Sequence, residues 1–179
     1  ISAYFDENTN KILKHLQQRI ADKTGNDFMI RNNVMPHLTI SAIEARNIDV
    51  LIPEFEKVCR GKLQPLEEKS VANNTINIVS LGQLFPRVIY AAPVLNEYMM
   101  NLSISIYNEF ATIPETNISK FYQPYSWMPH ITLGKCLDKE QMRQAFAVLQ
   151  DLFMPIDGRI TKIGLSTVNP YREVMSVAL

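Results

Sequence analysis

The chain has 179 residues, 46% of them hydrophobic, which is enough to bury one substantial core. Its 18 Lys and Arg side chains balance 18 Asp and Glu side chains. This zero net charge argues against a partner such as long nucleic acid, because that binding depends on clustered cations, but it allows a small anionic substrate.

The two cysteines give no sign of a metal or redox motif. Cys59 and Cys136 lie far apart in the sequence and form no Cys-x-x-Cys pair, which suits a reduced compartment. There is no leading basic-then-apolar signal and no apolar run long enough to span a bilayer. We therefore expect a cytoplasmic monomer with no membrane partner, no metal and no cofactor.

Strand and helix patterns alternate along the first half of the chain. The helix pattern ends at Gly25, a residue typical of helix C-termini. In chain order we expect strand 1–5, helix 11–23, strand 35–41, helix 47–60 and strand 75–81.

The second half repeats this order. Asp138, followed three residues later by Gln141, predicts a capping box at the start of its second helix. The expected elements are strand 88–94, helix 96–110, strand 128–134, helix 139–150, strand 159–167 and a final strand 173–179.

This repeated order indicates an internal duplication. We expect an α+β fold in which two mainly antiparallel sheets face each other around a central cleft, with helices on the outside. The whole chain, 1–179, would form one bilobal domain with pseudo-two-fold symmetry. Its lobes would cover roughly 1–85 and 86–179, with exchange of strands between them possible.

The duplication is clearest in one short stretch, "MPHLTISAIE" from Met35 and "MPHITLGKCL" from Met128. Side chains alternate along a strand, so His37 shares a face with Thr39. By the same rule His130 shares a face with Thr132. If an approximate two-fold relates the halves, these four side chains converge on one cleft.

Two imidazoles and two hydroxyls suit a tetrahedral phosphate. Hydrolysis of a phosphate diester needs one proton removed from the attacking oxygen and another delivered to the leaving oxygen, and two histidines divide that work. Threonine hydroxyls donate hydrogen bonds to the non-bridging oxygens. The alternative is that duplication merely preserved a packing motif. The third histidine, His15, reads as a solvated or half-buried helix residue.

These residues resemble a known family, the two-histidine phosphoesterases, also called LigT-like or 2′-5′ RNA ligase-like proteins. "PHLTI" and "PHITL" match its paired motifs, and the likeness covers nearly the whole chain. The resemblance implies a bilobal α+β fold and metal-independent phosphoesterase chemistry. It assigns catalysis to His37, Thr39, His130 and Thr132. Members of the family differ in which histidine is the acid and which the base, and of the two assignments we favour His37 as the acid and His130 as the base in ring opening.

Residues outside the motifs are candidates for substrate binding. Three aromatic residues before the second motif would either stack on a base or ribose or pack the loop onto the sheet: Tyr122, Tyr125 and Trp127. Four cations would either clamp phosphate or remain surface charges: Arg31, Arg87, Lys135 and Arg172.

The leading hypothesis is an enzyme that hydrolyses a 2′,3′-cyclic phosphate or a related phosphodiester of a short RNA or a nucleotide. Cleavage of 2′-5′ oligoadenylate, or of a cyclic phosphate derived from ADP-ribose, is an alternative within the family. A module that binds nucleotides or RNA ends without turnover is an alternative of another class. The intact His and Thr of both motifs favour an enzyme.

Overall fold

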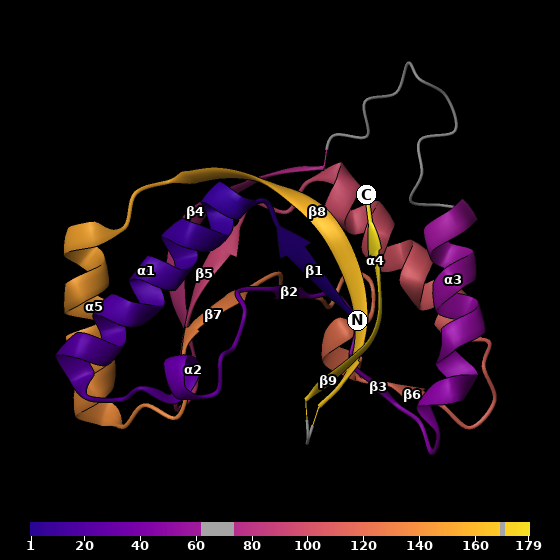
Figure 1. Cartoon of the computed structure of the whole chain (residues 1–179), viewed down its shortest axis with the longest axis horizontal. Coiled ribbons are helices and arrows are strands. Elements are labelled where there is room, and N and C mark those ends of the chain that lie inside the picture. The colour runs from indigo at the N-terminus through magenta and orange to yellow at the C-terminus, as the bar shows by residue number, and fades with distance from the viewer. Residues whose placement is uncertain (62–73, 169–170) are drawn as a thin grey trace.

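The computed structural model describes residues 1–61, 74–168 and 171–179 (Figure 1). The α-helices are α1 (Glu7–Thr24), α2 (Phe28–Arg31), α3 (Ile52–Gly61), α4 (Glu97–Phe110) and α5 (Lys139–Leu152). Short 3-10 turns cover Ile48–Leu51 and Lys120–Tyr122. The strands are β1 (Ser2–Phe5), β2 (Leu38–Thr39), β3 (Ile43–Glu44), β4 (Thr75–Leu84), β5 (Val88–Pro93), β6 (Asn117–Ile118), β7 (Ile131–Gly134), β8 (Ile156–Thr167) and β9 (Arg172–Ala178).

The ends of the longer helices follow the sequence signals. At the start of α1 the Asp6 carboxylate accepts a 2.9 Å hydrogen bond from the Thr9 amide, and Gly25 ends the helix with φ at 69°. The predicted capping box at α5 is confirmed, because Asp138 and Gln141 each bond to the other's backbone amide. Capping residues at the N-termini and a glycine at the C-terminus of α1 therefore set where these helices begin and end.

All strand pairings among the described residues are antiparallel. Seven strands form one sheet in the order β1-β2-β7-β5-β4-β8-β9, and an additional pairing of β1 with β8 closes a circuit. A second sheet contains only β3 and β6. The mixed architecture with antiparallel sheets is confirmed. The main strands of both halves, however, share one sheet instead of forming two similar sheets that face each other.

The length of β8 explains this difference. The strand has 12 residues, so its first part pairs with β4 and its later part pairs with both β1 and β9. Strands from the two halves of the chain are therefore mixed in one sheet, with β8 beside both β1 and β4, and β4 beside β5.

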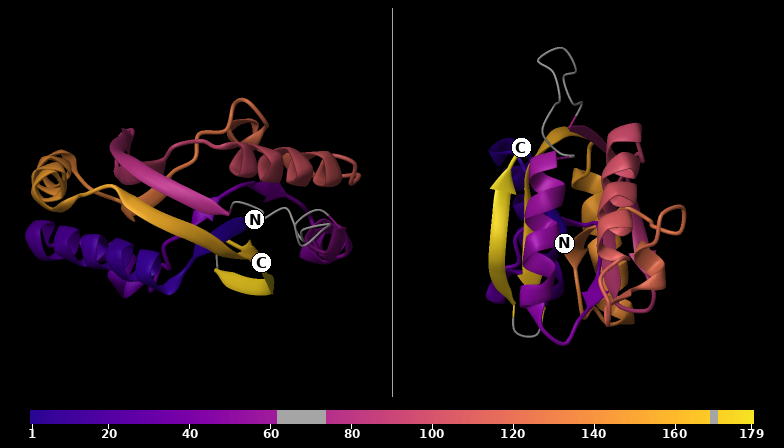
Figure 2. Two further views of the ribbon diagram at one scale, coloured as in Figure 1. Left: turned by 90° about the horizontal axis from the view of Figure 1, so that it is seen from above. Right: turned by 90° about the vertical axis from the view of Figure 1, so that its right-hand side faces the viewer.

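Helices cover the two flanks of the sheet. In Figure 1, α1 and α5 lie together at one flank and α3 and α4 lie together at the other, and the left view of Figure 2 shows the same arrangement. Leu13, Leu16 and Ile20 turn the apolar face of α1 into the core. Each such side chain contributes about 1.5–3 kcal/mol to folding when it is fully buried.

Both histidines of the repeated motifs lie just before their strands. We expected them inside strands 35–41 and 128–134, but β2 begins at Leu38 and β7 at Ile131. Pro36 and Pro129 lack the N–H that a ladder needs, so the regular pairing starts only after the histidine.

Candidate active site

The two His-x-Thr motifs lie on neighbouring strands. Leu38 of β2 pairs with Ile131 of β7, and neither side chain is exposed to solvent. In this antiparallel register Thr39 lies next to His130, and His37 next to Thr132. Because Leu38 and Ile131 point into the core, the neighbouring His and Thr side chains face the other way, and all four are half-buried. The structure thus brings the four predicted catalytic residues together.

A backbone contact fixes both imidazoles in the same way. The Nδ1 atom of His37 lies 2.7 Å from the carbonyl oxygen of Met35, and the Nδ1 atom of His130 lies 2.9 Å from that of Met128. A carbonyl oxygen only accepts, so each Nδ1 carries the hydrogen and donates. Nε2 is then the nitrogen that takes or gives a proton. The repeated Met-Pro-His sequence therefore builds one hydrogen-bonded turn twice.

Burial lowers the pKa of His37, and positive charge on His130 and Lys135 lowers it further. The hydrogen bond to Met35 acts in the opposite direction. The interaction with His130 agrees with the short separation of the motifs along the sheet. The net direction favours neutral His37, whose Nε2 accepts a proton.

The predicted aromatic residues have three different environments. Trp127 is 5% exposed, and its Nε1 donates a 3.0 Å hydrogen bond to the Thr39 carbonyl oxygen, so it packs its loop onto β2. Burial raises the pKa of Tyr122, and a hydrogen bond with the Thr39 side chain partly offsets that rise. Tyr125 is 84% exposed. Tyr122 is therefore the member of this group that contacts a predicted catalytic hydroxyl.

The predicted cations are also separated. Arg31 forms an exposed ion pair with Asp27, and Arg87 donates to the carbonyl oxygens of Cys136 and Leu137. Arg172 lies at the exposed start of β9. Lys135 follows β7, where its Nζ lies 5.8 Å from the Phe28 ring centroid. Of these four cations, Lys135 is the one whose charge acts on His37.

Sequence reasoning missed two tyrosines beside the histidines. The ring centroids of Tyr4 and His37 are 6.2 Å apart, and those of Tyr90 and His130 are 5.6 Å apart. Tyr90 pairs with Thr132 across β5 and β7. The available signal was one tyrosine in each of the predicted strands 1–5 and 88–94. That signal needed the strand register before it pointed to the site.

Glycines leave room for both tyrosine rings. A Cβ atom on Gly82 would lie 2.3 Å from the Tyr90 ring, and one on Gly164 would lie 2.9 Å from the Tyr4 ring. Each ring therefore lies over a glycine of the neighbouring strand. This close approach explains why glycine occupies a strand interior at both positions.

A pocket of about 720 Å³ lies away from the two histidines. It is lined by Asp6, Thr75, Ile76, Asn77, Val94, Asn96, Asp157, Gly158 and Arg159. It contains none of the motif residues, so it is not the predicted central cleft. Within the described ranges, no group of three or more His, Cys, Asp or Glu side chains is placed to hold a metal ion. No helix in the described part of the chain has the length and apolar character needed to cross a membrane.

Comparison with known families identifies the chain. The sequence model of the 2′-5′ RNA ligase superfamily matches residues 5–169, which include both motifs. The chain belongs to this superfamily. Membership supports a two-histidine phosphoesterase type of activity on phosphodiester bonds. No match was found among curated proteins.

Proposed function

We propose that this member of the 2′-5′ RNA ligase superfamily hydrolyses a 2′,3′-cyclic phosphate, or a related phosphodiester, of a short RNA or a nucleotide. The observation that carries the proposal is the pairing of Leu38 with Ile131, which puts both His-x-Thr motifs side by side. Each imidazole also has its Nδ1 hydrogen committed to a carbonyl oxygen, so both Nε2 atoms serve proton transfer.

In the proposed reaction His37 is the base and His130 the acid. Nε2 of His37 removes a proton from water as the water oxygen bonds to phosphorus. The bond from phosphorus to one ribose oxygen breaks, and Nε2–H of His130 protonates that oxygen to leave a phosphate monoester. The lowered pKa of His37 supports this order, which is the reverse of the one that we favoured from the sequence.

The threonine hydroxyls would hold the phosphate between the imidazoles. Thr39 and Thr132 would donate to its non-bridging oxygens and stabilise the charge that develops in the transition state. Tyr122 interacts with the Thr39 side chain and would help to hold it beside the phosphate.

We also infer that the chain is one domain made of two related halves. Two matching registers support this inference: Ala3 pairs with Leu38 in the first motif, and Ala91 pairs with Ile131 in the second. The exchange of strands between halves follows from the pairing of β8 with β1 and of β4 with β5.

The test is turnover of a substrate panel after dialysis against EDTA. The panel contains 2′,3′-cyclic mononucleotides, a short RNA with a cyclic phosphate end, 2′-5′ oligoadenylate and a cyclic phosphate of ADP-ribose. We expect monoester product from the first two substrates at an undiminished rate, because the proton transfers need only imidazoles. Loss of activity that returns only with Zn²⁺ or Mn²⁺ would contradict the mechanism. Tight binding without any product would favour the binding module.

A further inference from the structure

A lysine lies beyond the tyrosine that flanks His37. Tyr4 of β1 pairs with Lys162 of β8, so the two side chains stand on the same face of the sheet. The Lys162 Nζ lies 4.6 Å from the Tyr4 ring centroid, and that ring is the one beside His37. The ammonium is therefore held one aromatic ring away from the catalytic imidazole.

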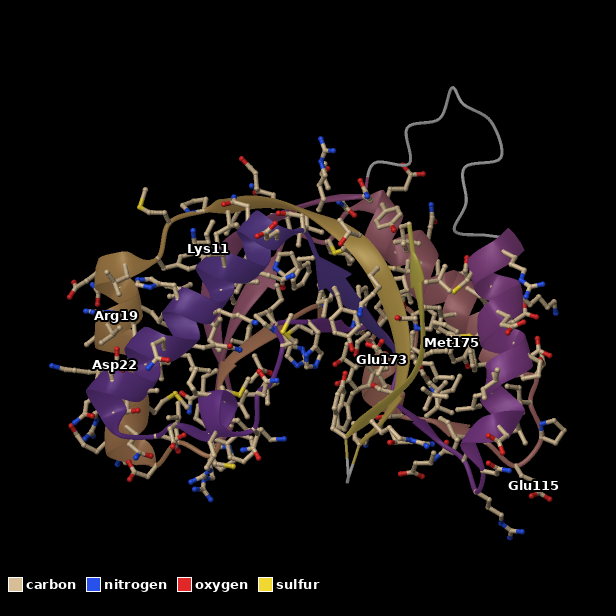
Figure 3. The ribbon with its side chains drawn as sticks, in the orientation of Figure 1. Lys11, Arg19, Asp22, Glu115, Glu173 and Met175 are labelled. Carbon is tan, nitrogen blue, oxygen red and sulfur yellow. The ribbon has the colours of Figure 1, made fainter. Side chains whose placement is uncertain are left out.

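Neighbouring residues fix Lys162 in this position. Its Nζ forms a 3.1 Å ion pair with Glu173 of β9, and Glu173 also accepts a 2.9 Å hydrogen bond from Ser176. These two bonds lower the pKa of Glu173, so the carboxylate stays charged. Figure 3 shows Glu173 on the side of β9 that faces the middle of the molecule, whereas Met175 lies toward α3.

The ion pair leaves Lys162 able to bind another anion. The Lys162 side chain is 38% exposed and that of Glu173 is 39% exposed. An ammonium carries three donors, and Glu173 accepts from one of them. A second anion that approaches from the site would therefore meet a positioned cation.

The described residues around His130 do not include a cation in the position that Lys162 has near His37. There the hydroxyl of Tyr90 lies 3.8 Å from the sulfur of Met128. Ser80 pairs with Ala92 at the positions that correspond in register to Lys162 and Tyr4. The cation therefore belongs to the His37 side, and the substrate would meet a charged flank there and a less polar flank beside His130.

We propose that Lys162, held by Tyr4 and Glu173, binds a second phosphate of the substrate, the internucleotide phosphate next to the reacting end of a short RNA. This inference rests on the proposed function, because it assumes that a nucleotide phosphate lies between His37 and His130. Lys135 acts on His37 itself and would serve the reacting phosphate. Lys162 would bind the internucleotide phosphate next to the reacting one, and would make the enzyme prefer a dinucleotide over a mononucleotide.

The experiment compares kcat/KM for a dinucleotide with a 2′,3′-cyclic phosphate end and for the matching cyclic mononucleotide. Lys162→Met should lower the ratio of the two values about tenfold, which is the loss expected for one charge-assisted contact. Lys162→Arg should keep most of the preference. Glu173→Gln should raise the ratio about twofold to threefold, because the glutamine amide oxygen still accepts a hydrogen bond from Lys162 while the negative charge beside the bound phosphate is removed.

Opposite effects of Lys162→Met and Glu173→Gln separate binding from structure. If the ion pair only stabilised the hairpin of β8 and β9, both variants would act in the same direction, and that result would overturn the proposal. Lys11→Met is the matched control, because Lys11 is exposed on α1 at the other flank (Figure 3) and should leave the ratio unchanged. Thermal unfolding of every variant shows that the comparison concerns folded protein.

The subsite and the catalytic function fail in different ways. If the parent hydrolyses both substrates and Lys162→Met leaves the ratio of the two kcat/KM values unchanged, only the subsite proposal is wrong. If the parent hydrolyses neither, the proposed function is wrong, and calorimetric binding of the mononucleotide and the dinucleotide, each with a terminal monoester phosphate, then decides the subsite. In that case weaker binding of the dinucleotide alone by Lys162→Met supports it, and equal binding by parent and variant overturns it.

Discussion

In the proposed mechanism single residues carry the chemistry, and the two imidazoles act as one unit. His37→Ala and His130→Ala should each lower turnover by about 10²- to 10⁴-fold, the range for loss of a positioned acid or base. Thr39→Val and Thr132→Val should cost about 10- to 10³-fold, because each removes one donor to the phosphate. The double histidine variant should be little worse than either single variant. Turnover measured beside thermal unfolding tests this; near-normal turnover in a folded histidine variant would refute the mechanism.

The positive charge around His37 predicts how kcat/KM depends on pH. In the proposed mechanism His37 is the base and must be neutral. Its pKa lies below the ordinary value of 6.5, so kcat/KM should stay high until the pH falls below 6.5. Lys135 disfavours the imidazolium, and Lys135→Met should therefore raise the pKa of His37 and move the acid limb of the pH profile to higher pH. The profile of kcat/KM for a cyclic mononucleotide measures both limbs. Movement of the acid limb to lower pH in Lys135→Met would assign that limb to another group.

At the scale of elements, the loop before β7 is fastened to β2 by Trp127. Trp127→Phe keeps the buried ring but removes the donor to the Thr39 carbonyl oxygen. The free energy of unfolding should fall by about 1 kcal/mol, because a buried acceptor loses its partner. KM should change by less than about twofold, since the indole packs the loop. Denaturant titration and steady-state kinetics test this prediction. A tenfold rise in KM at unchanged stability would show that Trp127 stacks on the substrate instead.

At the scale of the whole molecule, the closed circuit of strands couples the two halves. Strands β1 and β8 pair, as do β4 and β5, so neither half keeps its hydrogen bonds without the other. Thermal unfolding should be one cooperative transition. Fluorescence of Trp127, the chain's single tryptophan, should change at the same temperature as far-ultraviolet circular dichroism. Two separate transitions would show that the halves unfold independently.

The sequence alone determined the four longer helices, the paired motifs and the family. Helix periodicity and capping act over a few residues, so Asp138 with Gln141 placed the start of α5, and Gly25 the end of α1. His37 and His130 were found because the same tripeptide occurs twice. Their side-by-side position on the sheet remained a hypothesis at that stage, since it needed the pairing of residues far apart in the chain.

Tertiary structure decided which side chains surround the histidines. The long β8 joins strands that the sequence pattern assigned to two sheets, and its pairing with β1 sets Lys162 beside Tyr4. The sequence leaves Trp127 open to either stacking or packing, and its hydrogen bond to the Thr39 carbonyl oxygen makes it part of the packing. Strand register depends on contacts across the whole sheet, and a shift by one residue moves every side chain to the other face. For that physical reason the neighbours of His37 and His130 are fixed only when the sheet closes.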